Sequence, residues 1–224
     1  MSNLRLAIFD CDGTLVDSQR SIVRAMSSAF ASAGLHAPSR EDILSIVGLP
    51  LRRCVEVLLP TGDSATIDKI AQGYSDVYRH HRELGDDEPP LYPGTMDLLQ
   101  RLHQEGVLLA IATGKSRRGL THTMSVHGLN PLFVDSKTAD DGPGKPNPDI
   151  LIDLMQTWQV SPNECCMIGD TTYDIEMGVN AKTPSFGVTW GYHSPELLAG
   201  AGAQQVVDSW DELYGALRAH WPRN

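Results

Sequence analysis

Residues 4–18, LRLAIFDCDGTLVDS, constrain the fold of this chain more than any other stretch. The apolar run of residues 6–9 ends abruptly in Asp10-Cys11-Asp12-Gly13-Thr14. A short run of β-forming residues bounded by Asp and Gly predicts a buried parallel strand. In an open α/β sheet, functional residues gather just beyond the carboxyl ends of the strands. Asp10 and Asp12 therefore stand where such a sheet would carry its site.

The two acids Asp10 and Asp12 are separated by one residue, and side chains i and i+2 of an extended segment face the same way. Carboxylates this close repel each other, which raises the pKa of one of them. A hard divalent cation relieves that repulsion, and Mg²⁺ prefers oxygen ligands. The alternative is a solvated turn after a strand, since Asp and Gly are common turn residues. Cys11, between the two acids, is expected to face away from them and to pack.

The composition sets limits on the class of protein. The 224 residues suffice for one large domain or a core with a small insert, and 41% of them are hydrophobic. The net charge of −10 argues against nucleic acid or an anionic membrane as the main partner, but not against an anionic small molecule. No apolar run is long enough for a signal peptide or a membrane span, so we expect a cytoplasmic protein. The four cysteines form no CxxC pair, so we expect free thiols and no zinc site.

The periodicity of the chain changes twice. Residues 18–84 show helical spacing of apolar residues with no strong strand, and residues 85–90 form a charged, proline-bearing linker. Strands then alternate with helices, and strands are expected at 107–112, 132–134, 165–168, 185–188 and 205–207. This pattern predicts an α/β fold, a parallel sheet covered by helices on both faces, with a small helical unit inserted after the first strand. We expect a core of residues 1–16 and 91–224 and an insert of residues 17–90.

Three further groups of polar residues follow expected strands or precede expected helices. Thr113 and Gly114 end a strand, where a hydroxyl and backbone N–H groups suit a phosphate oxygen, although a simple helix cap is the alternative. Lys145 stands between Gly and Pro before a helix, where a solvated surface charge is the alternative. Asp170 ends another strand and Asp174 follows at a helix start, where it could be only a cap.

These four motifs, in this order, resemble those of the haloacid dehalogenase-like hydrolase superfamily, over nearly the whole chain. The segment Val188-Thr189-Trp190-Gly191-Tyr192-His193 is similar to the phosphoglycolate phosphatase-like branch, and the helical insert resembles a C1-type cap. The resemblance implies a Rossmann-like core. It also implies a Mg²⁺-dependent phosphatase that forms an aspartyl-phosphate and acts on a small phosphorylated metabolite.

The resemblance assigns roles to particular residues. Asp10 would be the nucleophile and Asp12 the general acid and base. Thr113, the Gly114 amide and Lys145 would hold the phosphate. The Mg²⁺ ion would bind the Asp10 carboxylate, the Asp12 backbone carbonyl and Asp170, whereas Asp174 would lie behind the metal or reach it through water.

Several questions stay open at this stage. Phosphoglycolate is the first candidate substrate, before pyrophosphate and sugar phosphates. Arg52 and Arg53 of the insert are candidates for contacting the substrate; the alternative is that both are solvated arginines on a helix of the insert. A dehalogenase would not need Asp12, and a β-phosphoglucomutase-like phosphotransferase would carry a His in residues 18–22, where this chain has none. A non-catalytic binding or regulatory module should have lost one of the motif residues, and all are present. The oligomeric state, monomer or homodimer, is open.

Overall fold

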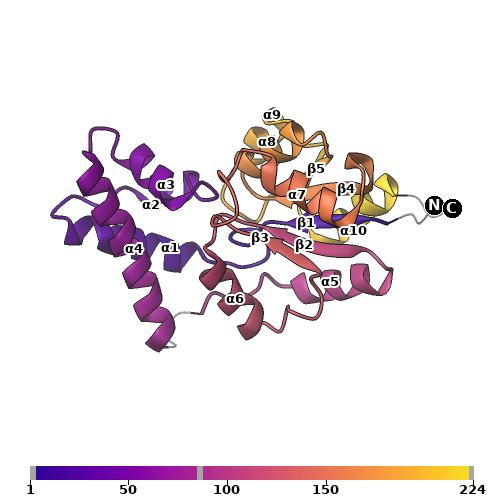
Figure 1. Ribbon diagram of the computed structural model, residues 1–224, viewed down its shortest axis with the longest axis horizontal. Coiled ribbons are helices and arrows are strands. Elements are labelled where there is room, and N and C mark those ends of the chain that lie inside the picture. The colour runs from indigo at the N-terminus through magenta and orange to yellow at the C-terminus, as the bar shows by residue number, and fades with distance from the viewer. Residues whose placement is uncertain (1–3, 85–87, 222–224) are drawn as a thin grey trace.

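The computed structural model describes residues 4–84 and 88–221 and contains a parallel six-stranded sheet within that part of the chain (Figure 1). The strand order is β3-β2-β1-β4-β5-β6, the order of a Rossmann-like α/β fold, as the sequence predicted. The strands are β1 (Leu6–Phe9), β2 (Leu108–Ala112), β3 (Asp135–Lys137), β4 (Cys165–Gly169), β5 (Ser185–Val188) and β6 (Gln205–Val207).

Strand β1 lies at the centre of the sheet and fixes where the polar residues meet. Its last residue, Phe9, is in register with Ile111 of β2 on one side and Ile168 of β4 on the other. All three strands run in the same direction, so their carboxyl ends lie at one edge of the sheet. The chain order changes direction at this point of the sheet, which is where open α/β folds bind ligands.

Two layers of helices bury the two faces of the sheet. Apolar residues of α5 (Thr95–Gln104), α6 (Arg117–Val126) and α10 (Trp210–His220) cover one face. Residues of α7 (Asp149–Trp158) and α8 (Thr172–Asn180) cover the other. The adjacent Cys165 and Cys166 belong to opposite faces, as strand alternation predicts. The short helix α9 (Pro195–Gly200) packs against β5 and β6, and a 3-10 turn covers Pro162–Glu164.

The segment between β1 and α5 folds into a separate group of helices at one end of the molecule, which we call the helical insert (Figure 1). It comprises α1 (Gln19–Ser32), α2 (Arg40–Ser45), α3 (Leu51–Leu58) and α4 (Ser64–Leu84), packed around their own apolar cluster. None of the helices in the described chain is both long and apolar enough to cross a bilayer.

The two connections between the sheet and the helical insert run side by side. Val16 forms an antiparallel bridge with Leu91, and the Asp17 amide donates to the Pro90 carbonyl at 2.9 Å. The Tyr92 amide donates to the Leu15 carbonyl at 3.0 Å. Part of the expected linker, residues 85–87, lies outside the described residues. The insert is thus joined to the sheet through one paired segment.

One expected strand was misplaced. The apolar residues 132–134 predicted a strand, but the strand observed on this edge is β3, the polar segment that follows them. Phe133 instead packs its ring edge-on against Phe9, with the ring centroids 6.4 Å apart. Phe133 is therefore buried by packing, while the ladder with β2 forms at Asp135–Lys137, a sheet edge that needs no apolar residues.

The close packing of α8 on the sheet yields a stability prediction. A Cβ atom added at Gly178 would lie 3.2 Å from Cβ of Ser185 and 3.3 Å from Cβ of Met167, whereas one added at Gly215 of α10 would meet nothing within 4 Å. We expect Gly178→Ala to lower the free energy of unfolding by about 1–3 kcal/mol, because α8 must shift. Gly215→Ala should raise it by up to about 1 kcal/mol through helix propensity. Urea unfolding of both variants checks this, and equal effects would contradict it.

Candidate active site

The ends of three neighbouring strands bring the predicted site residues together. Asp10 follows β1, Thr113 follows β2 and Asp170 follows β4, and all three are buried. Asp174 lies in the first turn of α8, directly after the β4 turn, and Lys145 comes from the loop before α7. Four sequence motifs that are far apart in the chain thus meet at one edge of the sheet.

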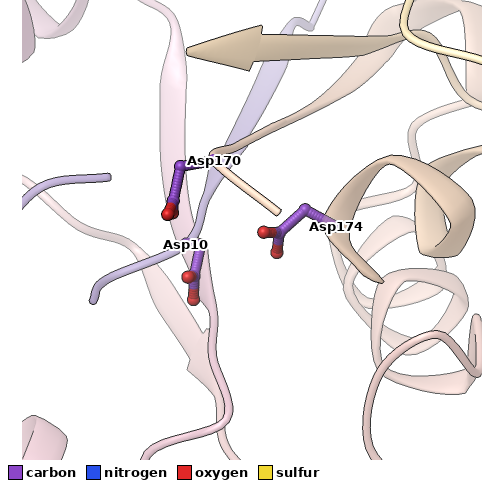
Figure 2. Close-up of side chains that lie close together, drawn as sticks. All are labelled: Asp10, Asp170 and Asp174. Carbon is purple, nitrogen blue, oxygen red and sulfur yellow. The ribbon is translucent and has the colours of Figure 1, made fainter. Parts of the chain in front are cut away.

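Asp10, Asp170 and Asp174 form a buried carboxylate cluster, in which one oxygen of each lies within 4.8 Å of one oxygen of the others. Figure 2 shows the three side chains pointing toward a common space, two from strand ends and Asp174 from α8. The Asp170 carboxylate accepts hydrogen bonds from the Thr14 hydroxyl at 2.8 Å and the Tyr192 amide at 2.9 Å. These bonds, one to each oxygen, fix the orientation of the Asp170 carboxylate.

Asp174 also caps the helix that carries it. Its Oδ2 atom accepts from the Thr171 hydroxyl at 2.7 Å and the Thr171 amide at 3.1 Å, which forms a capping box at the start of α8. Its other oxygen is left to face the cluster. The structure brings the Asp174 carboxylate into the cluster. The sequence prediction that it lies behind the metal or reaches it through water stays a prediction.

Lys145 supplies a positive charge to this cluster. Its Nζ atom lies 2.6 Å from Oδ1 of Asp10 and 2.6 Å from Oδ1 of Asp174, and the residue is 2% exposed. Burial alone would lower the pKa of Lys145, but the two carboxylates raise it above its ordinary value. Lys145 is therefore a fixed cation between two acids.

One lysine does not compensate the acids of the cluster. Burial raises the pKa of Asp10 to about 7 against the opposing attraction of Lys145, and Asp174 adds to the rise. Burial and the neighbouring carboxylates Asp174 and Asp10 likewise raise the pKa of Asp170 well above its usual range. Three buried carboxylates, two of them paired with one ammonium group, have the oxygen donors and the excess negative charge that a divalent cation needs. The residues therefore fit a metal such as Mg²⁺.

Asp12 is held by a lysine of its own. Oδ1 of Asp12 lies 2.6 Å from Nζ of Lys115, and both side chains are largely buried. Burial would lower the pKa of Lys115, but Asp12 raises it well above its ordinary value. The sequence prediction did not single out Lys115; its one signal is its place directly after Thr113 and Gly114, in the turn between β2 and α6.

Asp10 and Asp12 open into a cavity of about 420 Å³ between the sheet edge and the helical insert. Thr113, Gly114 and Lys115 line the same cavity from the sheet side. The backbone of the insert comes very close to this edge at Gly48 and Gly114. A Cβ atom added to Gly114 would lie only 2.8 Å from the carbonyl oxygen of Gly48. A group that enters the cavity therefore meets Asp10 and Asp12 together with the Thr113 and Gly114 motif.

The insert also contacts the sheet through Ser45 at the end of α2. Its carbonyl accepts a hydrogen bond from the Tyr173 hydroxyl at 3.2 Å and lies 3.0 Å from Nε2 of His193. Nδ1 of His193 accepts from the Thr172 amide, so Nε2 carries the proton and donates to Ser45. The segment after β5, which resembled the phosphatase branch, thus links the cluster to the insert.

The structure places Arg52 and Arg53 away from the cavity. Both are exposed on α3, where Arg52 Nε donates to Asp68 at 3.0 Å and Arg53 pairs with Glu56 at 3.2 Å. Neither belongs to the described residues that line the cavity. Their role at the substrate stays a prediction that the observed contacts do not support. Two other arginines, Arg79 and Arg118, do line the cavity, and sequence reasoning did not single them out.

Comparisons with known proteins agree with this geometry. Residues 7–188 match the family model described as haloacid dehalogenase-like hydrolase. This chain belongs to that family. It is 32% identical to a phosphoglycolate phosphatase of Vibrio parahaemolyticus, covering 94% of this chain and 95% of the relative. It is also 28% identical to the pyrophosphatase PpaX of Anoxybacillus flavithermus, covering 96% and 97%.

A solved structure extends the likeness to three dimensions. The crystal structure of a predicted phosphatase from Clostridium acetobutylicum aligns with a TM-score of 0.86 and 26% identity over 96% of this chain and 99% of that one. Together with the family match, these similarities identify the chain as a phosphoric monoester hydrolase of the haloacid dehalogenase-like family. The predicted enzyme class is confirmed.

The charge of the site predicts how Mg²⁺ affects stability at different pH. An Asp10 pKa of about 7 in the folded chain, against 3.8 unfolded, means that the metal-free folded state loses stability as pH rises from 3.8 toward 7. Above that range the penalty is complete, and a bound cation would remove it. We expect Mg²⁺ to raise the Tm more at about pH 8 than at about pH 6. Thermal unfolding of the wild type, and of Asp170→Asn as the variant that lacks one carboxylate of the cluster, tests this. An equal rise in Tm with Mg²⁺ at both pH values in the wild type would contradict it.

Proposed function

We propose that this enzyme hydrolyses phosphomonoesters with the help of Mg²⁺, through an aspartyl-phosphate formed on Asp10. One observation supports this most strongly. Of the four acids at the sheet edge, Asp10 and Asp12 line the cavity, whereas Asp170 and Asp174 lie buried behind them. A phosphate that enters from the cavity therefore reaches Asp10 first, with Asp12 beside it.

Asp10 is placed to attack phosphorus. An ionised carboxylate is required for that attack, and Lys145, 2.6 Å away, favours the ionised form against the effect of burial. The phosphoryl group passes to the Asp10 oxygen as the bond to the leaving oxygen breaks. The Thr113 hydroxyl, the Gly114 amide and the Lys145 ammonium group would hold the phosphoryl oxygens as charge builds on them.

Asp12 serves both halves of the reaction. As a protonated acid it gives its proton to the leaving oxygen, and as a carboxylate it then takes a proton from the water that attacks the aspartyl-phosphate. Lys115 fixes the position of the Asp12 side chain at the cavity wall. An acid that must change its protonation state is better placed at the cavity wall than within the carboxylate cluster.

The Asp10 and Asp170 carboxylates and the Asp12 backbone carbonyl would hold the Mg²⁺ ion, and Asp174 lies close enough to join them. When bound, the ion would neutralise charge on the phosphoryl oxygens and on the cluster. Lys145, already paired with Asp10 and Asp174, would keep these two acids in place in its absence.

The wider proposal concerns the whole chain. Residues 17–90 would act as a cap over the core of residues 1–16 and 91–224, and its opening would admit substrate to the cavity. The enzyme would act in the cytoplasm as a monomer or homodimer. Phosphoglycolate, the substrate after which the Vibrio parahaemolyticus relative is named, is the first substrate to test.

Replacement of Asp10 tests the nucleophile. Asp10→Asn keeps the shape of the side chain and removes the charge, so we expect turnover of p-nitrophenyl phosphate with Mg²⁺ to fall at least about 10³-fold. Asp211→Asn, the same change at an exposed side chain of α10, is the matched control and should keep full activity. A near-normal rate in Asp10→Asn would contradict the assignment of Asp10 as the nucleophile. Wild-type activity that survives exhaustive chelation would contradict the proposed dependence on Mg²⁺.

The role of Asp12 is separable from that of Asp10 by choice of leaving group. p-Nitrophenolate leaves without much help from a proton, whereas an alkoxide needs one. Asp12→Asn should therefore slow the phosphorylation step far more with an alkyl phosphate than with p-nitrophenyl phosphate. Single-turnover kinetics with both substrates measure this step, and equal losses would show that Asp12 is not the acid.

A further inference from the structure

The wall that the helical insert adds to the active-site cavity is mainly apolar. Side chains of α1, of the segment between α2 and α3, of α3 and of α4 contribute to it, and its apolar members include Ile22, Met26, Val47, Leu49, Leu51 and Tyr74. Among the described insert residues that line the cavity, Arg79 carries the sole formal charge, and it pairs with Asp76. The leaving group of a substrate whose phosphate sits at Asp10 must lie along this wall.

Two tyrosines contribute aromatic rings to this wall. Tyr74 and Tyr78 are one turn apart on α4, with ring centroids 5.8 Å apart and an angle of 33° between the planes. Both line the cavity, and burial raises the pKa of Tyr78 to about 12 and that of Tyr74 well above its usual range. Both phenols are therefore neutral near neutral pH, and neighbouring rings of this kind suit stacking against a planar apolar group.

The cavity is large for a small substrate that consists of two charged groups, a phosphate and a carboxylate. Its volume of about 420 Å³ falls in the range of sites that enclose drug-sized ligands, roughly 300–1,000 Å³. A two-carbon acid would leave most of it unfilled. Where it meets the apolar members of the wall, its carboxylate would lack a charged partner, and burying a charge without a partner is costly. Two of the cations that line the cavity already have partners: Arg79 pairs with Asp76, and Lys115, whose ammonium lies 5.5 Å from the centroid of the Tyr78 ring, pairs with Asp12 at 2.6 Å.

We infer that the preferred substrate is a phosphomonoester of an uncharged, largely apolar alcohol that carries a planar ring, with the ring against Tyr74 and Tyr78. This inference rests on the proposed phosphatase reaction and specifies its leaving group. Exposed polar residues, among them Gln72, Ser75 and Arg118, line the cavity farther out, where a substrate can carry polar substituents. The named substrates of the relatives, phosphoglycolate and pyrophosphate, already differ in leaving group within the family.

Three alkyl phosphates form a matched test with the wild-type enzyme and Mg²⁺: ethyl phosphate, 2-phosphoglycolate and 2-phenylethyl phosphate. All release a primary alcohol, so the same kind of P–O bond breaks, while the rest of the leaving group changes. We expect kcat/KM for 2-phenylethyl phosphate to exceed that for ethyl phosphate by about 10- to 100-fold, the effect of burying one aromatic ring. The carboxylate of 2-phosphoglycolate should bring no gain over ethyl phosphate.

A charge placed on the wall tests the same inference from the side of the protein. Leu51 begins α3 and lines the cavity, whereas Val57 on the same helix is 45% exposed and lies outside it. Leu51→Arg should lower kcat/KM for 2-phenylethyl phosphate at least about 10-fold and raise that for 2-phosphoglycolate. Val57→Arg, the matched control, should change neither. Leu51→Ala, which removes apolar surface without adding charge, should weaken the preference for the ring if Leu51→Arg does not fold.

The outcomes separate this inference from the proposed function. If p-nitrophenyl phosphate hydrolysis does not depend on Asp10, the proposed function fails. If it does depend on Asp10 but 2-phosphoglycolate is turned over as well as or better than 2-phenylethyl phosphate, the reaction stands and the inference about the leaving group is overturned. An Asp10-dependent enzyme that gains nothing from the phenyl ring also overturns it.

Discussion

The buried contact of Lys145 with Asp10 and Asp174 is the interaction on which the site depends. Parallel strands deliver Asp10 and Asp170 to adjacent positions, and α8 adds Asp174, so the fold itself concentrates negative charge away from water. Without a cation between them, such acids would take up protons or separate. Lys145, 2.6 Å from two of them, favours the ionised form of Asp10, the proposed nucleophile, within a buried site.

The same arrangement divides the work between the two parts of the enzyme. In the proposed reaction the charged groups at the sheet edge would bind the phosphoryl group, which is common to all phosphomonoesters. The helical insert carries an apolar wall with two tyrosine rings, and this wall would face the group to which the phosphate is attached. The insert is joined to the sheet by one paired segment at Val16 and Leu91, and it contacts the core again where the Ser45 carbonyl meets Tyr173 and His193.

Sequence reasoning succeeded where burial and strand direction decide position, and it failed where side-chain contacts decide. Residues 6–9 are apolar, residues 185–188 are buried although they include Ser185, and both strands were predicted with the observed bounds. Strand β3 was misplaced because its residues are polar and lie at an edge. Lys115 was missed because a lysine in a polar turn looks solvated until the fold places Asp12 2.6 Å away. Arg52 was considered for its charge, but its partner Asp68 lies on the neighbouring helix α4.

The central claim is that the charge balance at the sheet edge prepares Asp10 to accept a phosphoryl group. Rapid acid quench of Asp12→Asn with p-nitrophenyl phosphate and Mg²⁺, followed by mass spectrometry of the peptides, tests it most directly. Since this variant lacks the group that activates water, a phosphorylated enzyme should accumulate, with the phosphoryl group on Asp10. A phosphoryl group on any other residue, or release of p-nitrophenolate with no phosphorylated enzyme at any time, would contradict the account.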